Sequence, residues 1–222
     1  MFPVVKAFRI ALYIPEHFRV EDHAKALAFM RANPFTILVS NTAEGPFASH
    51  LPLVIRADGD HLTLRGHDAK ANPHWRYLEA DPKCLTIFHG PHAYISPTNY
   101  NTSENVPTWN YATVHIHGNA STLHAPEDLL RILHELIPLF EPTYADQWSS
   151  LNDAYRQRML SHIVGFEVAV TKIEAKFKLS QNRMRDEQQK VIESLSLVPD
   201  TAVSSTATLM REQGLGLKKE PK

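Results

Sequence analysis

The sequence has few of the features that tie a chain to a disulfide or to a bilayer. It contains a single cysteine among 222 residues, so no disulfide can form within the chain. That cysteine, Cys84, lies in the apolar run 84–88, which predicts a small buried thiol and not a nucleophile or a metal ligand. No apolar stretch is long enough to span a bilayer, and residues 1–14 show no secretory signal pattern. We therefore expect a cytoplasmic protein without a membrane partner.

An excess of charge of either sign is also absent. Lysine and arginine together number 23, against 24 aspartate and glutamate residues, and the isoelectric point is about 6.9. No overall field therefore draws the protein to nucleic acid, and any DNA contact has to be local. The sequence also has no P-loop, no GxGxxG after a strand, no GxSxG and no HExxH. These absences exclude the common nucleotide-binding, serine-hydrolase and zinc-protease motifs.

Short β-rich runs separated by turns are present instead. We expect strands at residues 35–40, 47–55, 62–65, 83–88, 108–121 and 164–173. Helices are expected at residues 20–32, 73–80, 126–140, 155–162, 184–195 and 201–213. About six strands in short hairpins, with helices between or beside them, favour an α+β fold built on a closed or split antiparallel β-barrel over a parallel α/β sheet.

Prolines and alternating side chains refine these expectations. In the run 47–55 the odd-numbered residues share one face, and Pro52 on the other face cannot donate to a ladder. That strand should therefore be at an edge, bulged, or open to a ligand. A loop is expected at 89–105. In the helix at 126–140 we expect Leu129, Leu133, Leu136 and Phe140 to face the core, and Pro138 to end or kink the last turn.

One stretch has the order of an anion site. Strand residues up to Arg65 are followed by Gly66, a polar turn, and a helix whose first-turn residue should be Pro73. Free amides at a helix N-terminus carry partial positive charge, and His67 and Lys70 could add donors to a phosphate held there. The alternative is that Gly66 only turns the chain and Asn72 only caps the helix.

Histidines and basic residues raise two further hypotheses. His115 and His117 point the same way from one strand, so a metal or haem site is conceivable, although a solvated polar face explains them as well. A basic cluster occurs near the end of the last strand, balanced by nearby acids; it consists of Lys172, Lys176, Lys178, Arg183 and Arg185. The helices that follow lack the compact turn of a helix-turn-helix. Direct sequence-specific DNA binding is therefore not predicted from the residues.

Several motifs follow one another in an order typical of one family. They are Tyr13-Ile14-Pro15 with Phe18, then 49–52, 66–75, 106–111 and 176–183. On these motifs the chain resembles, from about residue 12 to about residue 195, the PaiB-type FMN-binding negative transcriptional regulators of bacteria. The resemblance implies an FMN-binding split barrel related to pyridoxamine-phosphate oxidase, forming a homodimer with flavin at the subunit interface. It also implies repression of genes such as those for extracellular protease and sporulation, with DNA as a partner by resemblance only.

The resemblance also implies a division of the chain into domains and a set of cofactor-binding residues. We expect an N-terminal extension at 1–11, an FMN-binding split-barrel domain at 12–180 and a C-terminal helical tail at 181–222. The FMN phosphate would be held at Gly66, His67, Lys70 and Asn72. The ring or ribityl chain would be lined by Ser49, His50, Leu51 and Pro52, and the slot completed by Thr108, Trp109, Asn110, Lys178 and Gln181. For Lys178 and Gln181 the alternative is capping and packing where the barrel ends. Ser49 and His50 form no catalytic dyad, because neighbouring strand side chains face opposite ways.

This interpretation suggests two biochemical functions, and a third, weaker one is kept as an alternative. The first is a flavin-binding regulator without turnover, and no catalytic residue is assigned. The alternative is a split-barrel flavin oxidoreductase, a reductase or oxidase in which His50, Trp109 and Lys178 only position the cofactor. Haem binding or degradation on a similar barrel is the third.

Overall fold

The computed structural model describes residues 11–59 and 61–216, so the predicted extension at 1–11 lies almost wholly outside the described residues. The strands are β1 (Phe35–Thr42), β2 (Gly45–Pro52), β3 (Val54–Asp58), β4 (His61–Ala69), β5 (Lys83–Ile95), β6 (Thr108–Leu123) and β7 (Ile163–Lys178). The α-helices are α1 (His23–Ala32), α2 (His74–Ala80), α3 (Pro126–Phe140), α4 (Tyr144–Ser150), α5 (Asp153–Leu160), α6 (Arg185–Ser196) and α7 (Thr201–Glu212). Two 3₁₀ turns, η1 (Glu16–Phe18) and η2 (Pro97–Asn99), complete the described elements.

The strands form one sheet in the order β2-β1-β5-β6-β7-β4-β3. The pairings of β1 with β2 and β5, and of β4 with β3 and β7, are antiparallel. The first and last strands of this order, β2 and β3, are separated in the chain by Leu53 alone. One extended segment therefore pairs first with β1 and then with β4, and β2 also contacts β4. This arrangement closes the sheet into a split barrel and confirms the predicted fold class, with α6 and α7 as its C-terminal helices.

The chain divides into two compact units. The core unit comprises Glu21–Pro91 and Ala112–Ile173, and the terminal unit comprises Met1–Val20, His92–Tyr111 and Glu174–Lys222. Strands β5, β6 and β7 each begin in one unit and end in the other. The predicted division at residues 11 and 180 stays a prediction, since compactness follows discontinuous segments of the chain.

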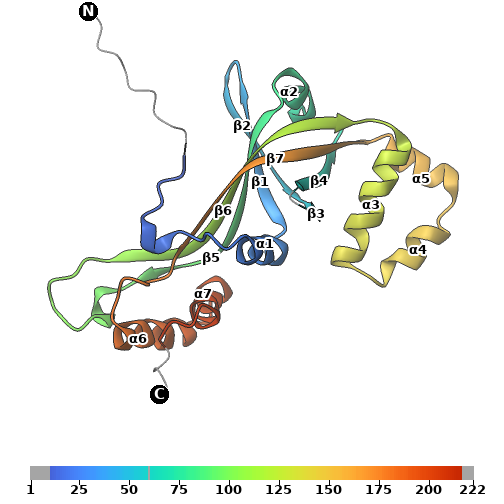
Figure 1. The fold of residues 1–222 in the computed structure, drawn as a ribbon. Coiled ribbons are helices and arrows are strands. Elements are labelled where there is room, and N and C mark those ends of the chain that lie inside the picture. The colour runs from blue at the N-terminus through green and yellow to red at the C-terminus, as the bar shows by residue number, and fades with distance from the viewer. Residues whose placement is uncertain (1–10, 60, 217–222) are drawn as a thin grey trace, which may run out of the picture. The chain divides into compact units, whose positions relative to one another are not determined.

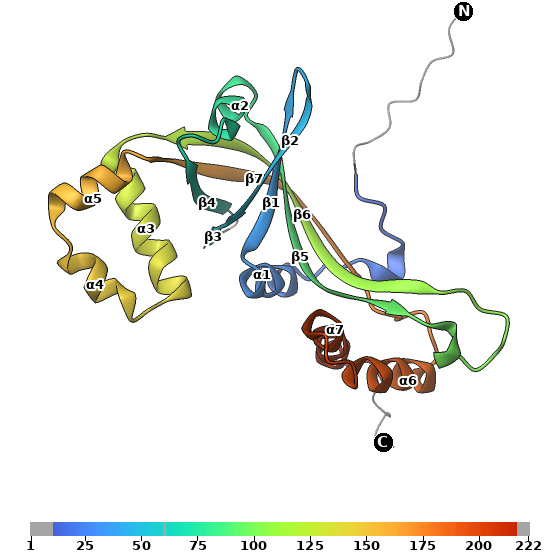
Figure 2. The same ribbon diagram turned by 180° about the vertical axis from the view of Figure 1, so that it is seen from behind.

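Large apolar side chains fill the core unit. Leu38, Leu53, Leu64, Phe88 and Phe166 are almost fully buried. Figure 1 and Figure 2 show α3, α4 and α5 as a group between the end of β6 and the start of β7. Helix α3 packs closely on β7, because a Cβ atom built on Gly165 would lie 2.7 Å from Ile132 Cδ1. The glycine thus allows helix and strand to approach.

The terminal unit has its own apolar centre. Helices α6 and α7 lie side by side, as Figure 2 shows in red, and contact each other extensively. Val191, Ile192, Ala207 and Met210 are buried between them and the neighbouring strand ends. The predicted apolar face of α6 is confirmed at Val191 and Leu195, but Met184 is exposed and lies at the N-cap.

The prediction of a single strand at 47–55 is wrong, because this segment forms two strands, β2 and β3. Pro52 has no N–H, and the N–H of Leu53 donates to Pro34 O (3.0 Å) instead of to a ladder partner. The side chain of Leu53 is fully buried at this break. Of the three alternatives expected for this strand, the edge position agrees with the sheet order, in which β2 is the first strand.

Other boundaries also differ from the predictions. Strand β5 continues to Ile95, so the loop predicted at 89–105 begins only after it, and β7 runs on to Lys178. Helix α4 was not predicted. Helix α3 accommodates Pro138 and continues to Phe140, which is exposed, while Ile132 takes the buried position in place of Leu133. Burial of Cys84 is confirmed, and it raises the pKa of the thiol to about 12.

Candidate functional site

The predicted phosphate turn is shorter than the sequence suggests. Gly66 and His67 lie within β4 and pair with Phe166 and Gly165 of β7, so Gly66 does not turn the chain. A Cβ atom at Gly66 would lie 2.5 Å from Leu53 Cδ2 and 3.2 Å from the ring of Phe166. The glycine therefore serves close packing inside the barrel, and the polar turn between β4 and α2 is confined to residues 70–73.

A chain of hydrogen bonds, which we call the Ser49 network, joins this turn to the first two strands. The amide of Asn72 donates to Asp68 Oδ2 (2.7 Å) and to Ser49 Oγ (2.9 Å). Ser49 Oγ also contacts His74 Nδ1 (2.8 Å), and the other ring nitrogen of His74 contacts Ser40 Oγ (3.0 Å). Burial lowers the pKa of His74, against an opposing effect of Asp68. His74 is thus a neutral, buried link that fixes Ser49 and Asn72.

Backbone bonds hold the turn itself. The N–H of Lys70 donates to His162 O (2.8 Å), and the indole of Trp75 donates to Lys70 O (3.1 Å). The amides of His74 and Arg76 are already taken, by Asn72 Oδ1 and by Pro73 O respectively. These N–H groups are therefore engaged within the protein, so side chains are favoured as the donors to any phosphate here. The side chain of Lys70 is exposed and available for that role.

His67 offers a second group at this end of β4. Its Nδ1 is buried without a hydrogen-bond partner among the described residues. Burial lowers the pKa of His67, and the charge of Asp68 only partly opposes this effect. A buried ring nitrogen without a partner is costly unless a ligand supplies one. This orphaned atom and the exposed Lys70 fit a phosphorylated ligand.

The residues of β2 alternate as expected. Ser49 and Leu51 are buried, whereas His50 is exposed and Pro52 is half-buried at the strand end. The ring of His50 lies 6.4 Å from that of Phe35, a large apolar side chain that is 56% exposed. His50 and Phe35 thus belong to an open face, and Ser49 and Leu51 belong to the interior.

The remaining predicted residues lie in the terminal unit. Trp109 is 53% exposed and contacts the rings of Tyr94 and His92, each at 6.1 Å between centroids. These three side chains form a partly exposed aromatic surface. The three rings are tilted relative to one another, and the exposed face of the Trp109 indole is suited to stacking against a ring.

The side chains of Asn110 and Gln181 form hydrogen bonds within the protein. Asn110 is fully buried, and its amide donates to Ser180 Oγ (2.9 Å), which donates back to Asn110 Oδ1 (3.1 Å). Ser180 has a left-handed backbone with φ of +67°, and this reciprocal pair fixes it. The side chain of Gln181 accepts from Leu179 N–H and donates to Phe177 O, which caps the end of β7. For Gln181 the structure therefore favours the capping alternative.

Lys178 lies beside this cap. Its ammonium donates to Thr108 Oγ1 (2.5 Å) and to Trp109 O (2.6 Å), and it lies 5.8 Å from the ring of Phe18. The pKa of Lys178 is lowered by burial first, and then by the like charges of Lys176 and Arg183. Thr108 and Lys178, both among the predicted cofactor residues, are therefore in contact with each other.

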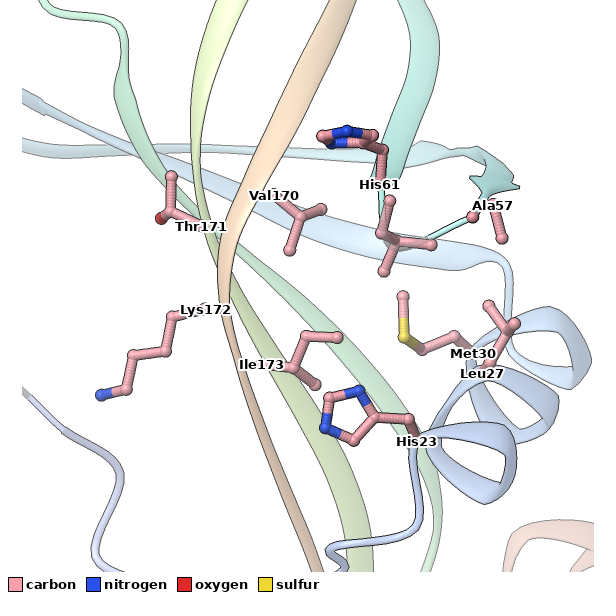
Figure 3. A pocket seen from close by; sticks show the side chains of 11 residues that line it. His23, Leu27, Met30, Ala57, His61, Val170, Thr171, Lys172 and Ile173 are labelled. Carbon is pink, nitrogen blue, oxygen red and sulfur yellow. The ribbon is translucent and has the colours of Figure 1, made fainter.

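A separate cavity of about 470 Å³ lies in the core unit at the opposite end of β4. Figure 3 shows His23 and Met30 of α1, Val170 and Ile173 of β7, and His61 around it, while Lys172 points away. Strand β4 runs from His61 to Ala69, roughly 26 Å at 3.3 Å per residue. The cavity is thus distinct from the Ser49 network, and it contains none of the predicted cofactor residues.

Some site features escaped the sequence reasoning. His74 stood in the motif at 66–75 but was not assigned, because a helix start gives no sign that the side chain turns inward. The role of Ser40 could not be predicted from the sequence either, since only the pairing of β1 with β2 brings Ser40 to His74. No three His, Cys, Asp or Glu side chains of the described residues are grouped to hold a metal ion. No helix in the described part of the chain has both the length and the apolar character needed to cross a membrane.

Comparison with known sequences gives extensive matches. The family model described as "Putative FMN-binding domain" matches residues 12–172. The protein "Protease synthase and sporulation protein PAI 2" of Bacillus subtilis is 38% identical over 211 residues, covering 94% of this chain and 100% of that protein. The uncharacterized protein AN0679 of Emericella nidulans is 28% identical over 228 residues, covering 83% of this chain and 90% of its own.

Solved structures share the fold at low sequence identity. The flavocytochrome Anf3 of Azotobacter vinelandii aligns with a TM-score of 0.56 and 14% identity, covering 74% of this chain and 72% of that chain. The FAD and heme binding protein of Mycobacterium smegmatis aligns with a TM-score of 0.55 and 13% identity, covering 72% and 73%. At these identities the likeness concerns the fold alone.

Proposed function

Because the chain belongs to the FMN-binding domain family matched over residues 12–172, we propose that it is an FMN-dependent negative transcriptional regulator that acts as a homodimer in the cytoplasm. FMN is the cofactor, and the protein is an FMN-binding split barrel. One observation carries the regulatory part of the proposal. It is the 38% identity, over the full length of the relative, to the Bacillus protein named for protease synthesis and sporulation.

We assign the phosphate of FMN to the turn between β4 and α2. Lys70 supplies an exposed cation, and His67 supplies a buried nitrogen that lacks a partner among the described residues. Asn72 and Ser49 act through the Ser49 network, which fixes the turn, and Gly66 keeps β4 close to Leu53. Leu51 and Pro52 support the strand whose exposed His50 faces the ligand side. A preformed turn that carries the exposed cation of Lys70 suits a dianionic group.

The ring edge of the flavin is assigned to residues of the terminal unit of the partner subunit in the proposed homodimer. Trp109 provides the exposed aromatic surface, with Thr108 and Lys178 beside it. Asn110 and Gln181 hold this segment in place from the buried side. The bound flavin supplies redox or ligand-sensing chemistry, and these residues bind and orient it.

FMN fluorescence during titration with protein tests the phosphate assignment. Lys70→Ala should weaken FMN binding by about tenfold or more, because one charge-assisted hydrogen bond to the phosphate is lost. Lys83→Ala, which removes an exposed lysine elsewhere in the core unit, is the matched control and should bind as the parent does. Equal affinity of both variants would exclude Lys70 from the site.

Fluorescence anisotropy with the DNA upstream of the protein's own gene tests the regulatory role. We expect salt-sensitive binding that differs between the FMN-loaded and FMN-free protein. Binding that is absent at low salt in both states would refute direct repression. Sustained NAD(P)H oxidation with FMN, reduced in Lys70→Ala, would instead identify a flavin oxidoreductase.

A further inference from the structure

A smaller cavity, of about 200 Å³, lies within the terminal unit and has features that FMN binding leaves unexplained. Its lining comes from η1, from the loop before β6 and from the end of β7. Phe18 and Tyr100 provide aromatic surface, Pro107 and Thr108 belong to the loop side, and Lys178 and Arg183 provide cationic groups. The lining thus combines rings and positive charge and contains no acidic side chain.

The positive charge in this cavity is not neutralised. Lys178 donates only to neutral oxygens, and Arg183 donates to the amide oxygen of Asn105 (2.7 Å). Neither side chain forms an ion pair with a carboxylate of the described residues. The lowered pKa of Lys178, caused by burial and then by Lys176 and Arg183, is the electrostatic sign of this imbalance. A bound anion would relieve it.

The guanidinium of Arg183 is held in a fixed place. Its Cζ atom lies 3.8 Å from the centroid of the Tyr100 ring, a close cation–π contact. Its second anchor is the hydrogen bond to Asn105. A guanidinium fixed in this way is preorganised, so little rotamer entropy is lost when it binds a ligand.

Tyr100 adds an independent indication of a ligand. The side chain is only 7% exposed, and its hydroxyl is buried without a hydrogen-bond partner among the described residues. A buried hydroxyl in this state costs free energy unless another molecule completes it. Because Tyr100 also lines the cavity, a ligand there is the natural source of that partner.

We propose that this cavity binds a one-ring organic carboxylate, with the carboxylate between Lys178 and Arg183 and the ring against Phe18 and Tyr100. A volume of about 200 Å³ holds a single ring, whereas drug-sized ligands and flavins need larger pockets. The inference deepens the proposed function and rests on it in part, since Thr108 and Lys178 are assigned to the cofactor as well. The carboxylate is a second ligand of the FMN-bound protein.

Calorimetric titration of benzoate into the full-length protein, with and without FMN and at constant ionic strength, tests the proposal. We expect saturable binding of benzoate and none of benzyl alcohol, which has the ring but not the charge. Arg183→Gln should weaken benzoate binding by about tenfold or more, and Tyr100→Phe by about threefold to tenfold. Arg31→Gln removes the same charge from an exposed position in α1 and should change nothing.

FMN binding, measured by fluorescence on the same variants, keeps the two assignments separate. Lys70→Ala should lose FMN and still bind benzoate, and Arg183→Gln should do the reverse. Equal binding of benzyl alcohol, binding of inorganic phosphate alone, or parental benzoate affinity in both Arg183→Gln and Tyr100→Phe would overturn the proposal. Full displacement of benzoate by FMN would overturn it too, because the cavity would then belong to the cofactor.

Discussion

Two polar clusters, the Ser49 network of the core unit and the cationic cavity of the terminal unit, differ in whether their buried groups have partners. In the core unit, the Ser49 network gives every polar atom of Ser40, Ser49 and the His74 ring a partner, and the charged Lys70 stays outside. In the terminal unit, Lys178 and Arg183 line a cavity without a carboxylate partner among the described residues, and the Tyr100 hydroxyl is left alone. The first arrangement is complete without a ligand. The second is electrostatically incomplete.

This difference separates positioning from binding. A network in which every group has a partner stabilises the fold and holds the turn that carries Lys70. Disrupting the network should therefore lower the free energy of unfolding first. A cluster without partners destabilises the ligand-free protein. Removing such a cluster should therefore change the free energy of unfolding little, and should weaken ligand binding instead. Variants of the two regions should therefore respond in different assays.

The largest effect should come from His74→Ala. The substitution leaves a cavity, removes one of the two partners of the Ser49 hydroxyl and removes the ring partner of the Ser40 hydroxyl, so we expect a loss of about 3 kcal/mol in the free energy of unfolding. Urea denaturation measures it. His124→Ala, which removes an exposed imidazole paired with Glu79, is the control and should cost well under about 1 kcal/mol. Equal losses would mean that the network does not stabilise the core unit.

Gly66→Ala should have the next largest effect. The added Cβ meets Leu53 at 2.5 Å, and the resulting overpacking should cost about 2 kcal/mol in the free energy of unfolding. The double variant with Leu53→Ala should lose less than the sum of the single losses, because the smaller side chain makes room. Additive losses in urea would show that the glycine is needed for another reason.

The stability of the core unit should fall in mild acid. His67 and His74 both have a pKa lowered by burial, so below about pH 6.5 the unfolded chain binds protons that the folded protein does not. Stability is thus fullest above that pH and decreases toward pH 5, by at most about 1.4 kcal/mol per pH unit for each histidine. His67→Gln should flatten the dependence of the urea midpoint on pH. A slope equal to that of the parent protein would contradict this origin.

The smallest effect should be that of Tyr100→Phe on the free protein. Removing a buried hydroxyl without a partner should leave the free energy of unfolding unchanged or raise it by up to about 1 kcal/mol. Tyr155→Phe, at a 41% exposed ring, is the control for the chemical change alone. A clear loss of stability for Tyr100→Phe alone would reveal a structural role for the hydroxyl and weaken the contrast between the units.

The sequence predicted the periodic elements well and the irregular ones poorly. β-rich composition located β1, alternation located β6, and the spacing of apolar residues located α1 and α6, because all of these patterns are local. The break at Leu53 was missed because it depends on which strands pair with each half of the segment. Similarly, Gly66 was interpreted as a turn residue because close packing against Leu53 cannot be seen locally.

The sequence motifs predicted which residues belong to the candidate site, but they did not predict the structural role of each residue. The motifs placed Lys70 in the turn before a helix, as the structure does, and they assigned Trp109 to the flavin slot, which stays a prediction. They did not reveal that Asn110 would be fully buried against Ser180, or that His74 would turn inward to Ser40. These roles depend on hydrogen bonds between residues 34 and 70 positions apart, which no local pattern encodes.

The terminal unit is assembled from separate stretches of chain, and this limits how the protein can be shortened. Its apolar centre includes Val191, Ile192, Ala207 and Met210, all of which follow residue 181. A stop codon there would not trim a dispensable tail. It would remove much of that unit's interior and leave the amide of Asn110 without its contact to the sulfur of Met210 (3.6 Å). Deletion phenotypes in this region should therefore be interpreted as failures of folding before they are interpreted as losses of a recognition surface.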